Sequence, residues 1–549
     1  MSATGSQPLR HLGDFETTPR VLLVAALAIP IGALSAGVAW CLLRLIGLIT
    51  NAVFYQRFGT ALVAPGEGHH SPALILLAPV CGGLVIGLMA RFGSEKIRGH
   101  GIPEAIESIL VSGSRVQPRV AVLKPIASAV AIGTGGPFGA EGPIIMTGGA
   151  FGSIWAQLLH LTADERKTLL VAGAAAGMAA TFNAPLASVL LAVELLLFEW
   201  RPRSFIPTVS AVAVATALRV PLLGSGALFP APSGALHLDG ATYALCVASG
   251  IVAGLLALAA TTLVYLSEDT FQRLPVHWMW WPAIGGAIVG VGGLIVPQAL
   301  GVGYNVIESE LDGSIELNLV VGILVVKTLI WSLSLGSGTS GGVLAPMLMI
   351  GGALGSLEAA VFPHVGPGFW PLVGLAGVLG GVMRSPLTGV VFAIELTHRY
   401  EALLPLLIGA TAAYGVSILV LRRSVLTEKI ARRGLHLTRE YSIDPLEVLF
   451  VDEVMDKSGS ETAALRSDGA VAHPDDTLRR VAYLMAERGT TRLPVVSRGD
   501  HDEVVGTVTL EQLLQGRLKD LEEERHSERV LSPRQLIGIR SRGDPSGDA

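Results

Sequence analysis

Long apolar blocks separated by short polar segments dominate the first three quarters of this sequence. Clear examples are residues 21–43, 72–90 and 241–266. Each meets the requirement of roughly 20 mainly apolar residues for a helix that crosses a lipid bilayer. Blocks of this kind recur until about Leu421. The pattern therefore predicts an all-α polytopic membrane protein over this part of the chain.

Composition agrees with the apolar pattern. The 549 residues are 51% hydrophobic and only 15% charged, with a mean hydropathy of +0.57, whereas soluble domains carry about 25% charged residues. The block at 21–43 has no small-residue cleavage site near its end, so we expect a span rather than a cleaved signal peptide. A net charge of −5 without a basic stripe gives no indication of nucleic acid as a partner.

The three cysteines, Cys41, Cys81 and Cys246, all lie within apolar blocks. Their spacing matches neither a metal site nor a disulfide framework, so we expect small buried hydrophobes. We expect no metal and no cofactor.

The membrane part contains an internal repeat. A shift of 203 positions places Lys124 on Lys327 and residues 148–153, GGAFGS, on GGALGS at 351–356. A shift of 201 places 185–195 on 386–396. Duplicated membrane domains are typical of transporters, whose inverted halves bring broken helices together near the midplane of the bilayer. We therefore expect two inverted helical repeats.

The repeat contains two glycine-rich stretches that precede proline, at 133–150 and 336–353. Proline is favoured where a helix begins, so Pro143 and Pro346 predict helix starts there. A helix start exposes unpaired backbone N–H groups and a positive dipole end, which together bind anions. Residues 99–110, with Pro103, have the same pattern. Of the two stretches matched by the repeat, only the first carries an acid, Glu141, and an acid inside a membrane domain is a functional candidate. In residues 99–110, Glu104 lies in the first turn of the expected helix, so we expect it to be a helix-dipole or packing carboxylate.

Other functions fit this pattern less well. GSGTSG at 336–341 matches the dinucleotide motif G-x-G-x-x-G, but that motif requires a short preceding strand, and here a long apolar segment precedes it. An enzyme would need a nucleophile–base pair or a metal cluster, which His100 and Glu141 alone do not form. A cation transporter would need acids at the helix starts. A receptor without transport would not need two facing broken-helix sites. The chain is therefore not expected to be an enzyme.

The motifs GHGIPE (99–104), GAEGP (139–143) and GVLAP (342–346) resemble the three anion-site signatures of the CLC family of chloride channels and proton–chloride antiporters. The resemblance covers about residues 20–435 in the correct order. It implies the CLC fold, a homodimer in the membrane, and Glu141 as the gating carboxylate that takes up or releases protons. It also implies an anion site built by His100, Gly101, Ile102, Pro103, Gly142, Val343, Leu344, Ala345 and Leu426.

Several positions depart from the family pattern. His100 replaces a central serine; its imidazole N–H could donate to an anion, or the ring could point away and leave backbone amides to bind. Leu344 replaces a phenylalanine. Leu426 stands where the family has a tyrosine, so a hydroxyl ligand is missing there. Leu195 stands where many antiporters have an inner glutamate, and the neighbouring Glu194 is expected to be structural, as is its repeat partner Glu395.

The missing inner acid favours a passive, voltage- or pH-gated chloride channel by a small margin. The alternative is a proton-coupled chloride antiporter, since some bacterial members exchange protons without that glutamate, or a variant selective for fluoride or nitrate.

After Leu421 the composition becomes that of a soluble protein. Residues 471–514 predict a turn, an amphipathic helix, a strand, a turn, a strand and a helix. Residues 449–514 resemble a CBS domain, which implies a small α/β cytoplasmic module. Gln512 replaces an acid that would hold a ribose, so a nucleotide ligand is not expected.

We therefore predict five segments and a multi-pass cell-membrane protein. The segments are an N-terminal cytoplasmic segment (1–20), membrane repeats (21–225 and 240–435), a CBS-like domain (442–516), and a charged helix with a disordered tail (517–549). Arginines beside the last span, Arg422 and Arg423 among them, favour a cytoplasmic C-terminus; the N-terminus is expected there too.

Overall fold

The computed structural model describes residues 18–110, 113–232, 234, 236–432, 446, 449–457, 470–497 and 504–525. The predicted tail beyond residue 525 and most of the N-terminal segment lie outside the described residues, as do the predicted boundaries at 435 and 442. The chain divides into two compact units, Phe15–Arg439 and a second unit that contains Glu440–Ala549.

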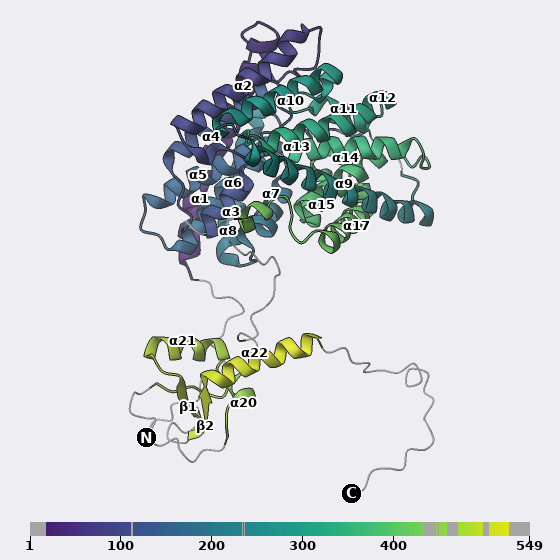
Figure 1. Cartoon of the computed structure of the whole chain (residues 1–549). Helices are drawn as coiled ribbons and strands as arrows, with labels where there is room; N and C mark the ends of the chain where they lie inside the picture. The colour runs from purple at the N-terminus through teal and green to yellow at the C-terminus, as the bar shows by residue number, and fades with distance from the viewer. Residues whose placement is uncertain are drawn as a thin grey trace, which may run out of the picture. The chain divides into compact units, whose positions relative to one another are not determined.

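The first unit is a bundle of helices (Figure 1). Its first half runs through α1 (Arg20–Phe54), α2 (Pro72–Phe92), η1 (Glu95–Ile97), α3 (Ile102–Leu110), α4 (Pro118–Gly133), α5 (Glu141–Gln157), α6 (Ala163–Phe182), α7 (Pro185–Leu191), the π-helical η2 (Ala192–Leu197) and α8 (Pro202–Leu223). Its second half runs through α9 (Gly240–Arg273), η3 (Trp278–Trp280), α10 (Trp281–Ile295), η4 (Pro297–Ala299), α11 (Tyr304–Asp312), α12 (Leu317–Gly322), η5 (Ile323–Lys327), α13 (Thr328–Gly336), α14 (Leu344–Ala359), α15 (Phe369–Met383), α16 (Pro386–Thr397), η6 (Tyr400–Ala402) and α17 (Leu403–Val420), followed by α18 (Glu428–Arg432).

The two halves repeat the same order of elements. A long first helix is followed by a second helix, a 3-10 turn and a short helix. A further helix then leads into a glycine-rich loop and the helix that follows it. Equivalent elements also contact each other: α2 packs on α10, and α7 packs on α16. The structure thus contains the duplication that the sequence shift predicts.

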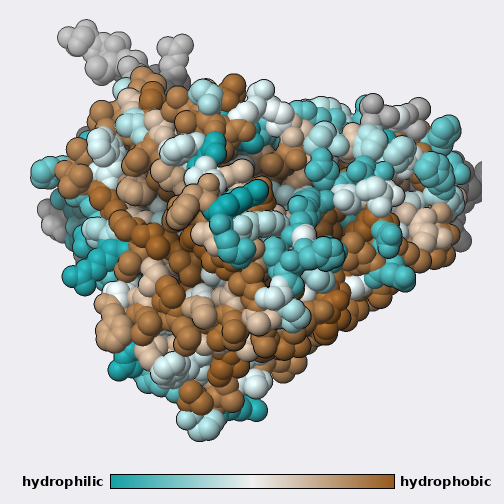
Figure 2. All heavy atoms as spheres, turned by 90° about the horizontal axis from the view of Figure 1, so that it is seen from above, coloured by the Kyte–Doolittle hydropathy of each residue, from teal (hydrophilic) through white to brown (hydrophobic). Residues whose placement is uncertain are grey.

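Seven helical segments among the described residues are long and apolar enough to cross a membrane: Arg20–Phe54, Pro72–Phe92, Pro202–Leu223, Gly240–Arg273, Trp278–Ile295, Leu317–Gly336 and Tyr400–Val420. Many large apolar side chains on them are exposed, for example Leu23, Leu88 and Val252. Seen from above, hydrophobic residues cover much of the surface, and hydrophilic residues lie near the middle and at several places along the rim (Figure 2). An exposed apolar surface on helices of this length fits a lipid environment.

The helices that follow the glycine-rich loops are shorter and lie inside the bundle. In α5 and α14 most residues are buried. Both begin two residues before the proline that predicts them, at Glu141 and Leu344. The difference has a simple cause: the first-turn N–H groups have no intrahelical partner, so proline is tolerated anywhere in that turn.

The second unit contains α20 (Val451–Val454), α21 (Leu478–Arg488), β1 (Arg492–Val496), β2 (Val504–Thr509) and α22 (Leu510–Arg525). The strands pair antiparallel, with Leu493 opposite Val508. The helix–strand–strand–helix order is the predicted one. The helix α22 is continuous across the predicted boundary between 516 and 517, which therefore does not separate two segments.

At the start of α22, Gln512 forms a reciprocal cap with Thr509. The Gln512 side chain accepts a hydrogen bond from the Thr509 amide at 2.8 Å, and the Gln512 amide donates to the Thr509 hydroxyl at 3.3 Å. This capping box satisfies two N–H groups at the helix start. The glutamine that replaces the expected ribose-binding acid thus has a structural role.

Candidate functional site

Three glycine-containing loops meet inside the membrane unit, and we call residues 99–101, 139–142 and 339–345 the central loop cluster. Two short backbone bridges join it, Gly99 with Ser340 and Gly139 with Gly342. In the second bridge, the Gly342 amide donates to the Gly139 carbonyl at 2.8 Å. The cluster therefore places the starts of α3, α5 and α14, which come from both halves of the repeat, next to one another.

The loops approach so closely that side chains would not fit. A Cβ on Gly101 would lie 2.5 Å from the Gly142 carbonyl oxygen, and Gly101 has a φ of +92°, a conformation that only glycine adopts readily. A Cβ on Gly342 would lie 2.6 Å from the Gly139 oxygen and 2.8 Å from a carboxylate oxygen of Glu141. The glycines are thus needed for close backbone contact.

The Glu141 side chain folds back over its own loop. One carboxylate oxygen accepts a hydrogen bond from the backbone N–H of Ala345, in the first turn of α14. The other has no hydrogen-bond partner among the described residues, and the side chain is fully buried. A negative group therefore occupies the N–H-rich start of α14, which is the kind of place where helix starts hold anions.

Two buried lysines occupy equivalent positions in the two halves and hold equivalent turns. Lys124 donates to the carbonyl oxygens of Ile97 and Gly99, at 2.8 and 2.6 Å. Lys327 donates to those of Ala299 and Gly301, at 2.9 and 2.7 Å. Each lysine thus holds the turn that precedes a short helix, α3 in the first half and α11 in the second.

Glu104 completes the support around α3. Its carboxylate accepts a hydrogen bond from the Gly101 amide at 2.8 Å and one from the Lys429 ammonium at 2.5 Å. Such contacts cap the helix and pair the acid, so Glu104 has the structural role expected from its place in the first turn.

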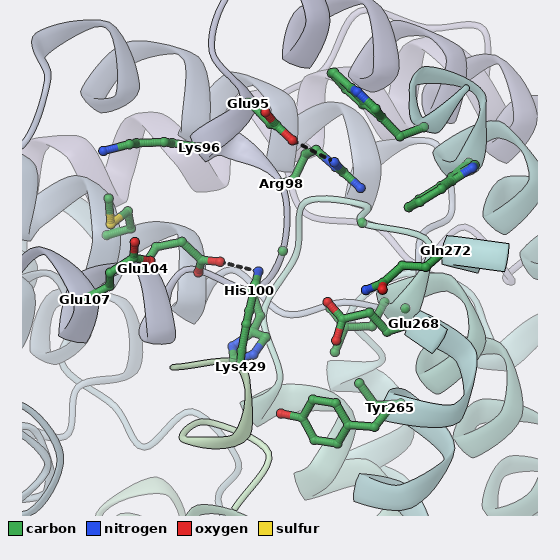
Figure 3. Close-up of a pocket in the computed structure, with 18 of the residues that line it drawn as sticks. Glu95, Lys96, Arg98, His100, Glu104, Glu107, Tyr265, Glu268, Gln272 and Lys429 are labelled. Atoms are coloured by element: carbon green, nitrogen blue, oxygen red, sulfur yellow. Dashed lines mark hydrogen bonds and ion pairs between the residues drawn. The ribbon is translucent and has the colours of Figure 1, made fainter. Parts of the chain in front are cut away.

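A cavity of about 520 Å³ reaches the cluster at His100 (Figure 3). Glu104 and Lys429 lie in its wall, joined by their ion pair, and Tyr265, Glu268 and Gln272 line another side. The guanidinium of Arg98 also lines it and lies over the ring of Trp278, at 4.8 Å from the centroid. The cavity is therefore polar and carries both signs of charge.

Three comparisons agree with this architecture. The family model described as voltage gated chloride channel matches residues 82–418, and a CBS domain model matches residues 464–519. This chain belongs to the CLC family. Its relatives include proteins named H(+)/Cl(-) exchange transporter ClcA from Salmonella arizonae and Salmonella newport. Each is 32% identical over 433 residues, which is 74% of this chain and 87% of the relative.

Solved CLC structures share the fold. A slow cyanobacterial Cl-/H+ antiporter aligns with a TM-score of 0.65 at 22% identity, over 76% of this chain and 98% of that one. A CLC-type fluoride/proton antiporter aligns with a TM-score of 0.61 at 18% identity, over 73% of this chain and 97% of that one. Membership of the CLC family makes this chain a multi-pass membrane protein of anion transport with a C-terminal CBS domain.

The structure brings most of the residues predicted for the CLC anion site into one place. His100, Gly101 and Gly142 are in the central loop cluster, and a Cβ on Gly142 would overlap the His100 carbonyl oxygen. Ile102 and Pro103 open α3, while Val343, Leu344 and Ala345 open α14. Their role as anion ligands stays a prediction.

Two predicted positions need separate comment. His100 lines the 520 Å³ cavity, and its Nδ1 has no hydrogen-bond partner among the described residues, so its side chain is available to an anion. Leu426 is fully buried in the turn before α18. Beside it, the hydroxyl of Tyr265 donates to the Val425 carbonyl, so a tyrosine does approach this turn, but from α9.

The two glutamates expected to be structural form a reciprocal pair of helix caps. Glu194 accepts a hydrogen bond from the Thr388 amide at 3.1 Å, at the start of α16. Glu395 accepts from the Leu186 and Ala187 amides at 3.0 and 2.8 Å, at the start of α7. Each half thus caps a helix of the other half, which supports the structural interpretation of both residues. Leu195 is fully buried.

Sequence reasoning did not assign roles to Lys124, Lys327 or Tyr265. The two lysines did have a signal, because they fall on each other in the repeat and a lysine is costly inside a membrane domain. Tyr265 had none, because it stands among apolar residues of a long helix and only the fold brings it to the turn before α18.

Proposed function

We propose that this chain is a proton-coupled chloride exchanger in which Glu141 is both the gate and a proton carrier. The observation that carries the proposal is the buried Glu141 carboxylate bound to the Ala345 amide at the start of α14. An ionised carboxylate there competes with an anion for the same N–H group. A protonated one is neutral and loses that competition, so anion entry and proton uptake are linked.

The relatives favour exchange over passive conduction. They are named H(+)/Cl(-) exchange transporters, at 32% identity. Their names weigh against the small preference for a channel, which rested on Leu195. A missing carboxylate at one position excludes only that position as a proton site, since the membrane unit contains other buried acids, Glu141 and Glu310 among them.

Chloride is the proposed substrate. His100, Gly101 and Ile102 at the start of α3, Gly142 in α5, and Val343, Leu344 and Ala345 at the start of α14 are its proposed ligands. Backbone N–H groups at helix starts bind anions without requiring a cationic side chain. We propose Leu426 as an apolar contact only, because it offers no side-chain donor.

The proposed assembly is a homodimer in the cell membrane with both termini in the cytoplasm. Arg422 and Arg423 directly follow α17, and basic residues beside a span favour the cytoplasmic side. Gln512 is engaged in its own helix cap, which supports a CBS domain that acts without a nucleotide.

The test uses the purified full chain in chloride-loaded liposomes, with chloride efflux and external pH recorded together. An exchanger drives protons uphill when only a chloride gradient is imposed. A Glu141→Gln variant should keep chloride flux and lose proton movement, because its amide cannot titrate. Chloride flux that moves no protons in the wild type would refute exchange and support the channel. An absence of chloride flux would refute chloride as the substrate.

A further inference from the structure

A second acid in the membrane unit has no assigned role. Glu310 lies on α11, is fully buried, and neither of its carboxylate oxygens has a hydrogen-bond partner among the described residues. Burying a carboxylate without partners is costly, so a purely structural acid would be expected to find donors. Acids in this situation inside a membrane are candidates for functional sites.

Glu310 can be compared with Glu104, the acid near the equivalent lysine of the first half. In the first half, Lys124 interacts electrostatically with Glu104, and Glu104 is fully engaged by the Gly101 amide and by Lys429. In the second half, Lys327 interacts electrostatically with Glu310, which has no such partners. Each half thus places an acid near its buried lysine. Among the described residues, the acid of the first half is hydrogen-bonded and the acid of the second half is not.

Glu310 also lies beside a cavity. It contributes to the wall of a cavity of about 440 Å³ together with Asp312, His364 and Trp370. On another side, its carboxylate approaches α14 so closely that a Cβ on Gly352 would overlap the Oε2 atom. The helices α11 and α12, which line this region, each pack against α14 (Figure 1).

Lys327 connects this acid to the gate. The lysine interacts electrostatically with both Glu310 and Glu141, although it hydrogen-bonds to neither and holds the Ala299 and Gly301 carbonyls instead. When one cation interacts with two carboxyl groups, their protonation is coupled. Once one carboxyl group is protonated and neutral, the cation stabilises the ionised form of the other. Such a pair is suited to carrying one proton between two places.

We propose that Glu310 is a second proton-binding carboxylate of the transport cycle, which exchanges protons with water in the 440 Å³ cavity and, across Lys327, with Glu141. The inference rests on the proposed exchange function. In the step, the ionised Glu310 takes a proton from hydronium in the cavity and leaves water. Its O–H bond then breaks as the proton passes through water to the ionised Glu141. Within the part of the chain that the structure describes, the charged and titratable groups around Glu310 are Lys327 and, in the cavity wall, Asp312 and His364.

The test compares Glu310→Gln with Glu358→Gln in the full chain. Glu358 is the matched control because it is another buried acid of the second half, on α14, but it is bonded to the Ser249 hydroxyl at 2.6 Å. Chloride efflux and chloride-driven proton uptake are recorded in the same liposomes. We expect Glu310→Gln to lower proton movement about tenfold or more relative to chloride flux, while Glu358→Gln keeps the wild-type ratio.

A second measurement separates proton binding from folding. Infrared difference spectra of the purified wild type between high and low pH should contain a carboxylic acid C=O band that disappears in Glu310→Gln. A wild-type ratio of protons to chloride in Glu310→Gln, with no missing band, would overturn the inference and leave the exchange function intact. A wild type that moves no protons would overturn both. Loss of chloride flux together with proton flux in Glu310→Gln, with no missing band, would assign the acid a structural role.

Discussion

Removal of the Glu141 carboxylate should make anions bind more tightly. In the structure, Glu141 occupies the Ala345 amide through one carboxylate oxygen. A hydrogen bond to a charged group contributes about 1.5–3 kcal/mol. Since each 1.4 kcal/mol corresponds to a factor of ten, freeing this amide in Glu141→Ala should raise chloride affinity by about tenfold to a hundredfold.

A series of substitutions makes the expectation sharper. Glutamine at 141 keeps an acceptor oxygen but loses the charge, and neutral hydrogen bonds contribute only about 0.5–1.5 kcal/mol. Chloride affinity should therefore increase in the order wild type, Glu141→Gln, Glu141→Ala. The wild type should approach the variants as the pH falls and the carboxyl group becomes neutral.

Isothermal titration of the purified chain with chloride, at constant ionic strength and neutral pH, measures the effect. Glu358→Ala is the control, because this buried acid hydrogen-bonds to the Ser249 hydroxyl and not to a backbone amide of the central loop cluster. Equal chloride affinity in the wild type and Glu141→Ala would refute the reasoning. It would mean that the Ala345 amide is not part of the anion site.

Three further predictions concern the scaffold. Gly342→Ala should abolish chloride flux without preventing insertion, because its Cβ would lie 2.6 Å from the Gly139 oxygen; normal flux in liposomes would contradict the close approach. Glu395→Gln should cost about 1–3 kcal/mol, since it loses a charged acceptor for two backbone amides, and an unchanged melting midpoint in detergent would argue against the cap. Asp239 caps α9, and hydrogen bonds from Thr242 lower its pKa. The ionised carboxylate therefore stabilises the folded protein above the usual pKa of about 3.9, and this stabilisation is lost as the pH falls below that value. Asp239→Asn should keep the cap and remove this pH dependence from thermal melts, and an identical acid sensitivity would contradict that.

Much of the architecture could be predicted because it depends on local chemistry and on repetition. Apolar length predicts the spans, and the shift between Lys124 and Lys327 predicts the two halves. Glycine followed by Pro143 or Pro346 predicts the starts of the inner helices to within two residues. These signals are local, so they can be read from the sequence without knowing which segments contact each other in the fold.

The remaining features depend on contacts between segments distant in sequence. No local pattern shows that Glu194 caps α16 while Glu395 caps α7, because each acid is separated from its partners by about two hundred residues. The lack of partners around Glu310 is equally invisible in the sequence, where ESELDG reads as the polar end of a helix. Burial of that acid becomes evident only when α14 is placed against α11.

The duplication explains both what is symmetric in this molecule and what is not. Equivalent lysines hold equivalent turns, and equivalent glutamates cap equivalent helices, so the scaffold is built twice by the same interactions. The Glu141 carboxylate, however, has no counterpart at the equivalent position of the second copy. At the shift of 203, the position that matches Glu141 is Leu344. The amide of the next residue, Ala345, donates a hydrogen bond to the Glu141 carboxylate. One copy thus supplies the acid, and the other supplies the helix start that this acid occupies. If both copies carried the acid, two negative groups would compete for the same small space. If neither did, the proposed anion site would lack the carboxylate that is its proposed proton carrier. Under the proposed exchange function, divergence at this one pair of positions would turn a symmetric pair of helix starts into a gated site.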